Sequence, residues 1–257
     1  MGKKVTSTSG TSAAGAKKKK KATSAEDARR TPTSATATAL PALLRLTPHA
    51  ERPLRAVDLH AALIFKVPHF FSRAECARVQ RFADSEGFSR VTQRATREFA
   101  FRDNDRLLLR LEAFAALLWP RLAPLVPHAC EEGLRAVGLN PNIRFYRYRA
   151  GQRFGCHVDQ SDVDPVTGFH SRFTVLVYLN DASDSDLAGG STVFYGPPAG
   201  AKKTKTTTQE EPVLSVAPES GAALVHGHGD RCLLHEGALV TRGCKYLLRT
   251  DVMYARV

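Results

Sequence analysis

The feature that most constrains the fold of this chain is a change in residue pattern at Asn142. From there to the end, the sequence consists of short stretches in which apolar and polar residues alternate. Turn-forming Gly, Asn, Asp and Pro residues separate the stretches. Period-two alternation bounded by such turns is typical of antiparallel strands with one buried face. The pattern predicts strands at 143–149, 153–159, 172–179, 191–195, 213–216, 221–226 and 244–254.

The first part of the chain carries helical patterns instead. Ser72 followed three residues later by Glu75 is a capping box, in which each side chain bonds the other residue's backbone N–H. Phe71 is placed to pack against the first turn, and Gly87 is a natural stop. We expect a helix between Ser72 and Gly87.

Two further helices are predicted before the strands begin. Apolar residues recur at helical spacing from Asp105 to Leu118, and Pro120 should end that helix. Asn104 and Asp105 are placed to cap it, and a substrate-facing role is the alternative for these two residues. A third helix is expected around 130–137. Helices followed by strands indicate an α+β chain, mainly β, with helices packed outside a sheet core.

Charge and composition divide the chain unevenly. Residues 1–39 lack aromatic residues and carry a net charge of +7 out of the total of +12, so we expect a disordered basic tail. Its lysine run, Lys17–Lys21, suits nuclear import or nucleic-acid contact, and equally a plain solvated segment. Residues 40–257 should form one domain, with helical support at about 57–140, the sheet core at about 142–257 and a polar, mobile surface insertion at 197–211.

Cysteine use and hydropathy bear on the compartment. The five cysteines form an odd set without CxxC spacing, which favours free thiols in a reducing environment over disulfides or a zinc ribbon. No apolar run reaches the roughly 18 residues of a membrane helix, and the first residues lack a secretory pattern. We therefore expect an intracellular protein, cytoplasmic or nuclear, with no membrane partner.

His157 and Asp159 are candidate metal ligands, because residues i and i+2 of a strand point to the same face. His235 is a candidate third ligand that the fold would have to bring alongside. Two histidines and one carboxylate on one face of an octahedral iron(II) leave positions open for a co-substrate and oxygen. Zinc accepts the same ligands, and an isolated HxD is more often a surface pair or a core hydrogen bond.

Four segments of the chain stand out together: YRAGQRFGCHVD (148–159), FTVLVYLND (173–181), GGSTVF (189–194) and HEGALVTRGCKY (235–246). They resemble segments of the prolyl 4-hydroxylase branch of the iron(II)- and 2-oxoglutarate-dependent oxygenases, and they occur in the family's order. The resemblance covers about 57–257, most strongly from Tyr148 onward.

The resemblance implies a double-stranded β-helix, or jelly roll, with iron(II) held by His157, Asp159 and His235. It also implies that Lys245, ten residues after His235, binds the far carboxylate of 2-oxoglutarate. A buried dianion needs a cation, which supports the same residue independently. Arg249 is the competitor, since residues i and i+4 of a strand share a face.

Three more positions match residues around the co-substrate in the family. Tyr178 corresponds to a hydroxyl donor to the co-substrate carboxylate, Thr192 to a pocket wall, and Tyr148 to a residue near the metal-chelating end. Each is also an ordinary strand or core residue in the absence of the motif. His226, His228 and Cys232 lack a fourth partner at zinc spacing, so turn and strand-end roles are favoured over a second metal site.

The implied reaction hydroxylates a substrate C–H bond and converts 2-oxoglutarate and O2 to succinate and CO2, with ascorbate as the expected reductant. A protein or peptide substrate is favoured, because the segments are nearest the prolyl hydroxylases. The alternatives are a small molecule or a nucleic-acid base, with the basic tail aiding contact, and a non-catalytic binding module that retains the fold.

Overall fold

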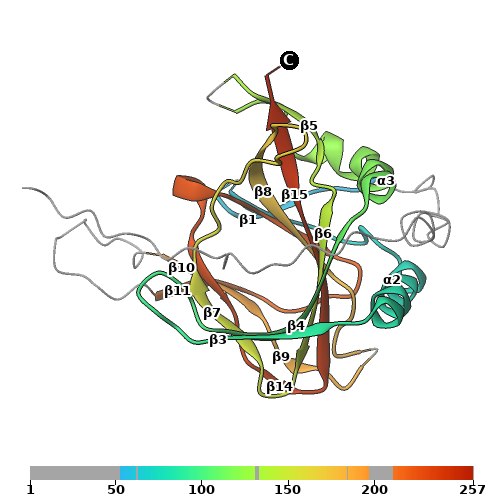
Figure 1. Ribbon diagram of the computed structural model, residues 1–257, viewed down its shortest axis with the longest axis vertical. Helices are drawn as coiled ribbons and strands as arrows, with labels where there is room; N and C mark the ends of the chain where they lie inside the picture. Colours follow the sequence, from blue (N-terminus) through green and yellow to red (C-terminus); the bar gives the residue numbers. More distant parts are fainter. Residues whose placement is uncertain (1–52, 62, 131–132, 184, 197–210, 257) are drawn as a thin grey trace, which may run out of the picture.

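The computed structural model describes residues 53–61, 63–130, 133–183, 185–196 and 211–256. Within these residues, thirteen strands join into one antiparallel sheet that curls round on itself, and two helices lie outside it (Figure 1). The predicted tail at 1–39 and nearly all of the predicted insertion at 197–211 fall outside the described residues. None of the described helices has both the length and the apolar character needed to cross a membrane.

The elements follow one another from the helical part into the strands. The helices are α2 (Arg73–Glu86) and α3 (Glu112–Leu122), with short 3-10 turns η1 (Ala123–Leu125) and η2 (Gly229–Arg231). The strands are β1 (Val57–His60), β2 (Ile64–Val67), β3 (Ser89–Gln93), β4 (Arg102–Arg110), β5 (Arg135–Leu139), β6 (Asn142–Arg149), β7 (Arg153–His157), β8 (His170–Tyr178), β9 (Ala188–Gly189), β10 (Thr192–Gly196), β11 (Glu211–Val216), β12 (Ala223–Gly227), β13 (Leu234–Gly237), β14 (Val240–Arg242) and β15 (Cys244–Ala255).

Eight of these strands form two sets of four. One set has the order β6-β15-β8-β12 and the other the order β7-β13-β10-β11, and β4 joins the sets by pairing with both β6 and β7. Apart from the consecutive pair β10 and β11, neighbours within a set come from distant parts of the chain, because the connections pass from one set to the other. This is the arrangement of a double-stranded β-helix, or jelly roll, so the predicted fold class is confirmed.

All seven predicted strands are present, with ends shifted by up to two residues. The largest shift that affects the predicted site is in β7, which ends at His157, so Asp159 follows the strand instead of belonging to it. Two strands, 102–110 and 135–139, were predicted as helices. The other strands that the pattern missed are short or half-exposed, such as 57–60, 89–93 and 234–237. Their pairing partners hold them in place, which no local pattern reveals.

Alternation along the central strands sorts side chains into two cores. On β8, Val175 and Val177 join the cluster that packs under α2 and α3, whereas Leu176 and Tyr178 point the other way. The second cluster fills the space between the two sets of strands, where Phe194 of β10 meets it. The inner face of the curled sheet is therefore where a site can form.

The first helix is confirmed with its capping box. The Ser72 Oγ accepts a hydrogen bond from the Glu75 N–H at 3.2 Å, and the Glu75 carboxylate accepts one from the Ser72 N–H at 2.7 Å. Phe71 is buried beside it, and Gly87 ends the helix with a φ of 83°. The buried face of α2 includes Val79, which packs into the outer core.

The second predicted helix was wrong over its first half. Residues 102–110 form strand β4, which pairs with β3, β6 and β7, so Asn104 and Asp105 are strand residues and cap nothing. The helix begins only at Glu112, and it contains Pro120 in its last turn instead of stopping there. The run of leucines is compatible with both the helical and the strand period, and the segment is a strand because it pairs with β6.

The third predicted helix, at 130–137, was also wrong. Arg135–Leu139 is strand β5, which pairs with the end of β15, and Cys130 and Leu134 are joined by a backbone hydrogen bond of a turn. Gly133 in that turn has a φ of 70°, which favours glycine and is incompatible with a continuing helix. The remaining residues of the predicted span, 131–132, lie outside the described part.

A buried ion pair joins the two helices. Arg121 donates to the Glu75 carboxylate at 3.0 Å and to the Phe70 carbonyl at 2.8 Å. The Glu75 side chain is buried, and the Arg121 side chain is 9% exposed. Replacing Arg121 with methionine is expected to lower the free energy of unfolding by about 3 kcal/mol, because Glu75 stays buried without its cation. Urea denaturation measures the change, and adding Glu75→Gln should recover part of it. A loss below about 1 kcal/mol would contradict this account.

Candidate active site

His157, Asp159 and His235 converge on the inner face of the sheet. Strands β7 and β13 are neighbours, and His157 and His235 are directly paired across them. The Asp159 carboxylate oxygens lie 3.8 Å from His157 Nε2 and 3.9 Å from His235 Nε2. The three candidate ligand atoms are all within 4.8 Å of one another and buried, so one metal ion can reach all three.

Backbone carbonyls orient both imidazoles. His157 Nδ1 lies 2.9 Å from the Gly155 carbonyl oxygen, and His235 Nδ1 lies 3.0 Å from the Leu233 carbonyl oxygen. A carbonyl can only accept, so each Nδ1 carries the proton and each Nε2 keeps its lone pair toward Asp159. Burial lowers the pKa of both histidines, and the charge of His235 lowers the pKa of His157 further. Both rings are therefore neutral and able to bind a metal.

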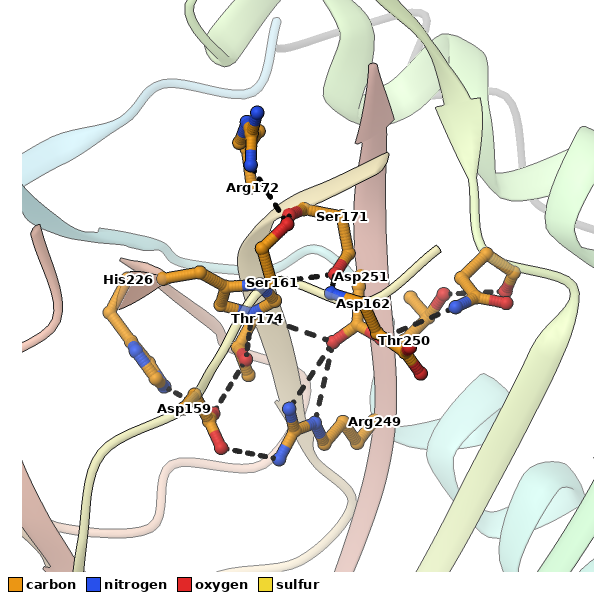
Figure 2. Close-up of polar contacts among 12 residues, drawn as sticks. Asp159, Ser161, Asp162, Ser171, Arg172, Thr174, His226, Arg249, Thr250 and Asp251 are labelled. Carbon is orange, nitrogen blue, oxygen red and sulfur yellow. Dashed lines mark hydrogen bonds and ion pairs between the residues drawn. The ribbon is translucent and has the colours of Figure 1, made fainter. Parts of the chain in front are cut away.

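The carboxylate of Asp159 is held from two sides (Figure 2). Thr174 donates its hydroxyl to Oδ2 at 2.7 Å, and Arg249 donates to Oδ1 at 3.1 Å. Burial alone raises the pKa of Asp159, but the Arg249 cation and the neighbouring histidines bring it well below its usual range. Asp159 is therefore ionised.

Lys245 lies in the same cavity as the three convergent residues. The cavity has a volume of about 40 Å³, and Tyr148, Thr192 and Arg249 also line it. Lys245 is buried, and its ammonium donates to the Gly190 carbonyl oxygen. Among the described residues, no carboxylate lies within ion-pair distance of it. Burial lowers the pKa of Lys245 to about 7, and an anion bound next to its ammonium group would stabilise the charged form.

Tyr178, Thr192 and Tyr148 surround Lys245. The Tyr178 and Thr192 hydroxyls are hydrogen-bonded to each other at 2.8 Å, and the Lys245 ammonium lies 5.5 Å from the Tyr178 ring centre and 5.7 Å from the Tyr148 ring centre. Burial raises the pKa of Tyr148 to about 12, so its hydroxyl keeps its proton. The structure thus brings together all the residues that the family resemblance singled out around the co-substrate.

Arg249 lies on the same strand face as Lys245, as its spacing predicts, but its guanidinium faces carboxylates. Besides Asp159 it reaches Asp251 Oδ1 at 3.4 Å (Figure 2). The other oxygen of this carboxylate, Asp251 Oδ2, lies 2.9 Å from Arg144. These carboxylates raise the pKa of Arg249 above its ordinary value. In the structure it is therefore a partner of Asp159, and a contact with 2-oxoglutarate remains a prediction.

The histidines of the HGHGDRC segment sit closer to the site than turn or strand-end roles suggest. His226, on β12, is buried with Nε2 3.8 Å from Asp159 Oδ2, and His228 bonds the Thr174 hydroxyl at 2.8 Å. His226, Cys232 and His235 have ligand atoms within 4.8 Å of one another. Since His235 belongs to both groups, this second cluster borders the first one.

Sequence reasoning missed the buried cations Arg102 and Arg106 of β4, and it interpreted Asn104 as a helix cap with a substrate-facing role as the alternative. The RDNDR pattern also has strand period, with basic or amide residues on one side and aspartates on the other. Arg102 lies 3.7 Å above the Phe154 ring centre, and Phe154 stacks on His157. These residues adjoin the site.

Comparison with known proteins agrees with this geometry. Residues 143–250 match the profile of the 2OG-Fe(II) oxygenase superfamily, and the span contains His157, Asp159, His235 and Lys245. Over that span the chain is similar to the iron(II)- and 2-oxoglutarate-dependent dioxygenases of this superfamily. No curated protein matches it.

Solved structures share the fold at low sequence identity. An oxidoreductase of the 2OG-Fe(II) oxygenase family from Burkholderia pseudomallei is 15% identical, with a TM-score of 0.50, covering 89% of this chain and 95% of that one. A Pseudomonas putida prolyl-4-hydroxylase is 18% identical, with a TM-score of 0.49 and coverages of 83% and 98%. A viral collagen prolyl hydroxylase from Paramecium bursaria Chlorella virus-1 is 18% identical, with a TM-score of 0.48 and coverages of 75% and 96%.

Proposed function

We propose that this chain hydroxylates a peptide substrate, with iron(II) held by His157, Asp159 and His235. The observation that carries the proposal is the convergence of two Nε2 atoms and one carboxylate within 4.8 Å. The donor set fits iron(II), since both imidazoles are neutral with their Nδ1 atoms tied to carbonyls and the carboxylate is ionised.

We propose that Lys245 binds the far carboxylate of 2-oxoglutarate. Support comes from its burial, the absence of a carboxylate partner among the described residues, and its place in the cavity that His157 and His235 also line. The paired hydroxyls of Tyr178 and Thr192 would donate to the same carboxylate, and Tyr148 would wall the chelating end. Arg249 would reach the co-substrate only by leaving Asp159.

Bound iron and 2-oxoglutarate, together with O2, would supply oxidative chemistry that no protein side chain supplies: one oxygen atom of O2 would enter succinate as CO2 leaves, and the other would convert a substrate C–H to C–OH. The part of the chain's own residues is positional. Thr174 and Arg249 fix the Asp159 carboxylate, and the carbonyls of Gly155 and Leu233 fix the imidazoles. Phe154, Leu176 and Leu247 line the cavity with apolar surface that excludes water.

A peptide, and proline in particular, is proposed as the substrate because four sequence segments are nearest to those of prolyl 4-hydroxylases. The test is succinate formation by the purified chain with iron(II), 2-oxoglutarate and ascorbate, with and without a pool of proline-containing peptides. We expect peptide-stimulated succinate and peptides heavier by one oxygen. Succinate without any oxidised peptide would point to a small molecule or a nucleic-acid base, and neither succinate nor iron binding would favour a non-catalytic module.

Affinity for 2-oxoglutarate is expected to fall with rising pH. With a pKa of about 7, Lys245 is already charged below pH 7, whereas above it the bound dianion must draw a proton onto the lysine. The dissociation constant should therefore rise about tenfold per pH unit above pH 7, up to the higher pKa of the complex. Calorimetry at pH 6 to 9 in buffers of different ionisation enthalpy measures both affinity and proton uptake. A Lys245→Arg variant should show a flat profile, and a flat profile in the unmodified chain would refute the assignment.

A further inference from the structure

Strand β4 presents two chemically different faces. Asp103 and Asp105 point to one side, where Asp103 pairs with Arg90 at 2.9 Å and Asp105 pairs with Arg147 at 2.9 Å. The alternate residues Arg102, Asn104 and Arg106 point to the inner side, where Arg102 pairs across to Phe154 and Arg106 pairs across to Tyr146. Both aromatic partners line the cavity of the candidate active site. The inner face of β4 thus brings cations next to that cavity.

Arg102 is a buried cation without an anion. It is 4% exposed, and its Nε is buried with no hydrogen-bond partner. No ion pair or hydrogen bond links it to any other residue in the described part of the chain, and its recorded contacts are with the rings of Phe154, at 3.7 Å, and Tyr146, at 6.0 Å. Burial and the charge of Arg106 lower the pKa of Arg102. Such a group is costly to the fold and calls for an external partner.

Arg102 also lies close to the metal ligands. Its guanidinium carbon is 3.7 Å from the Phe154 ring centre, and the His157 ring is stacked on Phe154 at 3.7 Å. Two groups at that spacing from one ring must occupy its opposite faces. Arg102 is therefore one aromatic ring away from a ligand, a separation that suits the binding of a substrate by a group other than its reacting carbon.

Asn104, the next inward residue on β4, has the same property. It is fully buried, and neither its amide nitrogen nor its amide oxygen has a hydrogen-bond partner. A buried amide left unpaired costs about 1–3 kcal/mol, and native structures rarely retain one without a reason. Its NH2 can donate to an anion, and its oxygen can accept an N–H from the same ligand.

The other charges of the cavity are already matched. Asp159 and Asp251 are engaged by Arg249 and Arg144, and Lys245 is assigned to 2-oxoglutarate. Iron(II) and dianionic 2-oxoglutarate would add charges that cancel. The inner face of β4 thus remains positive, with Arg102 as its unmatched charge.

We propose that Arg102 and Asn104 form a substrate subsite that binds a carboxylate, with Arg106 adding positive potential. The inference rests on the proposed hydroxylase function, and it narrows the substrate to an acidic peptide. The planar fork of Arg102 matches a carboxylate in geometry, and the Asn104 amide can donate to the carboxylate while accepting a peptide N–H. The carboxylate belongs to an Asp or Glu side chain near the target residue or to the carboxyl terminus of the peptide.

The test is affinity selection by the full chain loaded with Mn(II) and 2-oxoglutarate, read by mass spectrometry. The probes are three pools of proline-centred pentapeptides, all with an acetylated amino terminus. The first pool has Asp or Glu beside proline and an amidated carboxyl terminus, so its carboxylate is on a side chain. The second has Asn or Gln beside proline and an amidated terminus and carries no carboxylate, and the third has Asn or Gln beside proline and a free carboxyl terminus. We expect at least about tenfold enrichment of one carboxylate-bearing pool over the neutral one, corresponding to a charged hydrogen-bonded pair. The pool that is enriched shows whether the bound carboxylate comes from a side chain or from the carboxyl terminus of the peptide. Equal retention of all three would overturn the proposal.

Two matched variants assign the effect to this face. Arg102→Met should abolish the enrichment and raise the thermal midpoint, because it removes an unmatched buried cation. Arg90→Met removes one positive charge from the opposite face of the same strand pair and should keep the enrichment. If Arg102→Met retains the enrichment, or unfolds the protein while Asn104→Leu retains it, the subsite is refuted.

Succinate formation in the absence of peptide separates this proposal from the broader one. Unmodified protein that binds carboxylate peptides selectively but never produces succinate would refute the hydroxylase function and keep the subsite. Unmodified protein that produces succinate but binds all three peptide pools equally would refute the subsite and keep the hydroxylase function.

Discussion

Replacing His157 with alanine is expected to abolish succinate formation and to weaken iron(II) binding by more than about 100-fold, the upper range for loss of a group that merely supports a ligand. His157 supplies one of three donor atoms that lie within 4.8 Å of one another, and its removal leaves one imidazole and one carboxylate. Its ring also stacks on Phe154, so the variant's secondary structure must be verified by circular dichroism. Competition with a metal-sensitive dye measures the binding.

The matched control is His60→Ala, which removes a histidine from β1, a strand at the far end of the sheet order from β7. This variant should keep both iron affinity and turnover. A His157→Ala protein that is folded and retains metal affinity within threefold of the unmodified chain would show that the three residues are not the ligands.

Replacing Lys245 with alanine should raise the KM for 2-oxoglutarate by about 100-fold or more, corresponding to the roughly 3 kcal/mol of a buried charge pair that has lost one partner. Iron(II) affinity should stay unchanged, since Lys245 is not among the convergent donors. A raised KM for 2-oxoglutarate with unchanged iron(II) affinity is the result expected for a residue that binds the co-substrate, whereas loss of a residue that only supports the fold should change both.

Lys245→Arg should restore part of the affinity, since it keeps the charge on a bulkier group. Gly190 limits the restoration, because it packs closely on the Lys245 side chain: a Cβ added at Gly190 would lie only 3.1 Å from Lys245 Cδ, so a bulkier guanidinium has little room. Lys66→Ala is the control, since Lys66 pairs with Glu219 on the surface. A KM for 2-oxoglutarate within threefold of normal in Lys245→Ala would transfer the anchoring role to Arg249.

Where prediction from sequence succeeded, the signal was local. The alternation on β8 predicted both the strand and the face that Tyr178 shares with the cavity, because side chains in a strand alternate strictly. The capping box of α2 was equally local, since Ser72 and Glu75 satisfy each other's backbone within one turn. Such features depend on few residues and survive any change in the rest of the fold.

Where it failed, neighbours far along the chain decided. The spacing of the leucines in β4 is compatible with a helix as well as with a strand. Only the pairing of Leu107 with Phe145 and of Leu109 with Ile143, across β4 and β6, shows that the segment is a strand. Misplacing this strand also concealed Arg102 and the inner face that it shares with Asn104, because residues assigned to a helix start have no inner face of a sheet to occupy. The engagement of Arg249 by Asp159 could not be predicted either, since the spacing from His235 says nothing about which carboxylate lies opposite.

The sequence by itself determined the chemical groups of this protein and the strands that carry most of them, because alternation and short motifs are properties of neighbouring residues. It identified His157, Asp159, His235 and Lys245 through their spacing and their resemblance to a family. Only the tertiary structure decided that β13 lies beside β7, and hence that the groups meet. Strand pairing is the physical reason, because the partner of a strand is set by packing over the whole sheet, which no local pattern contains.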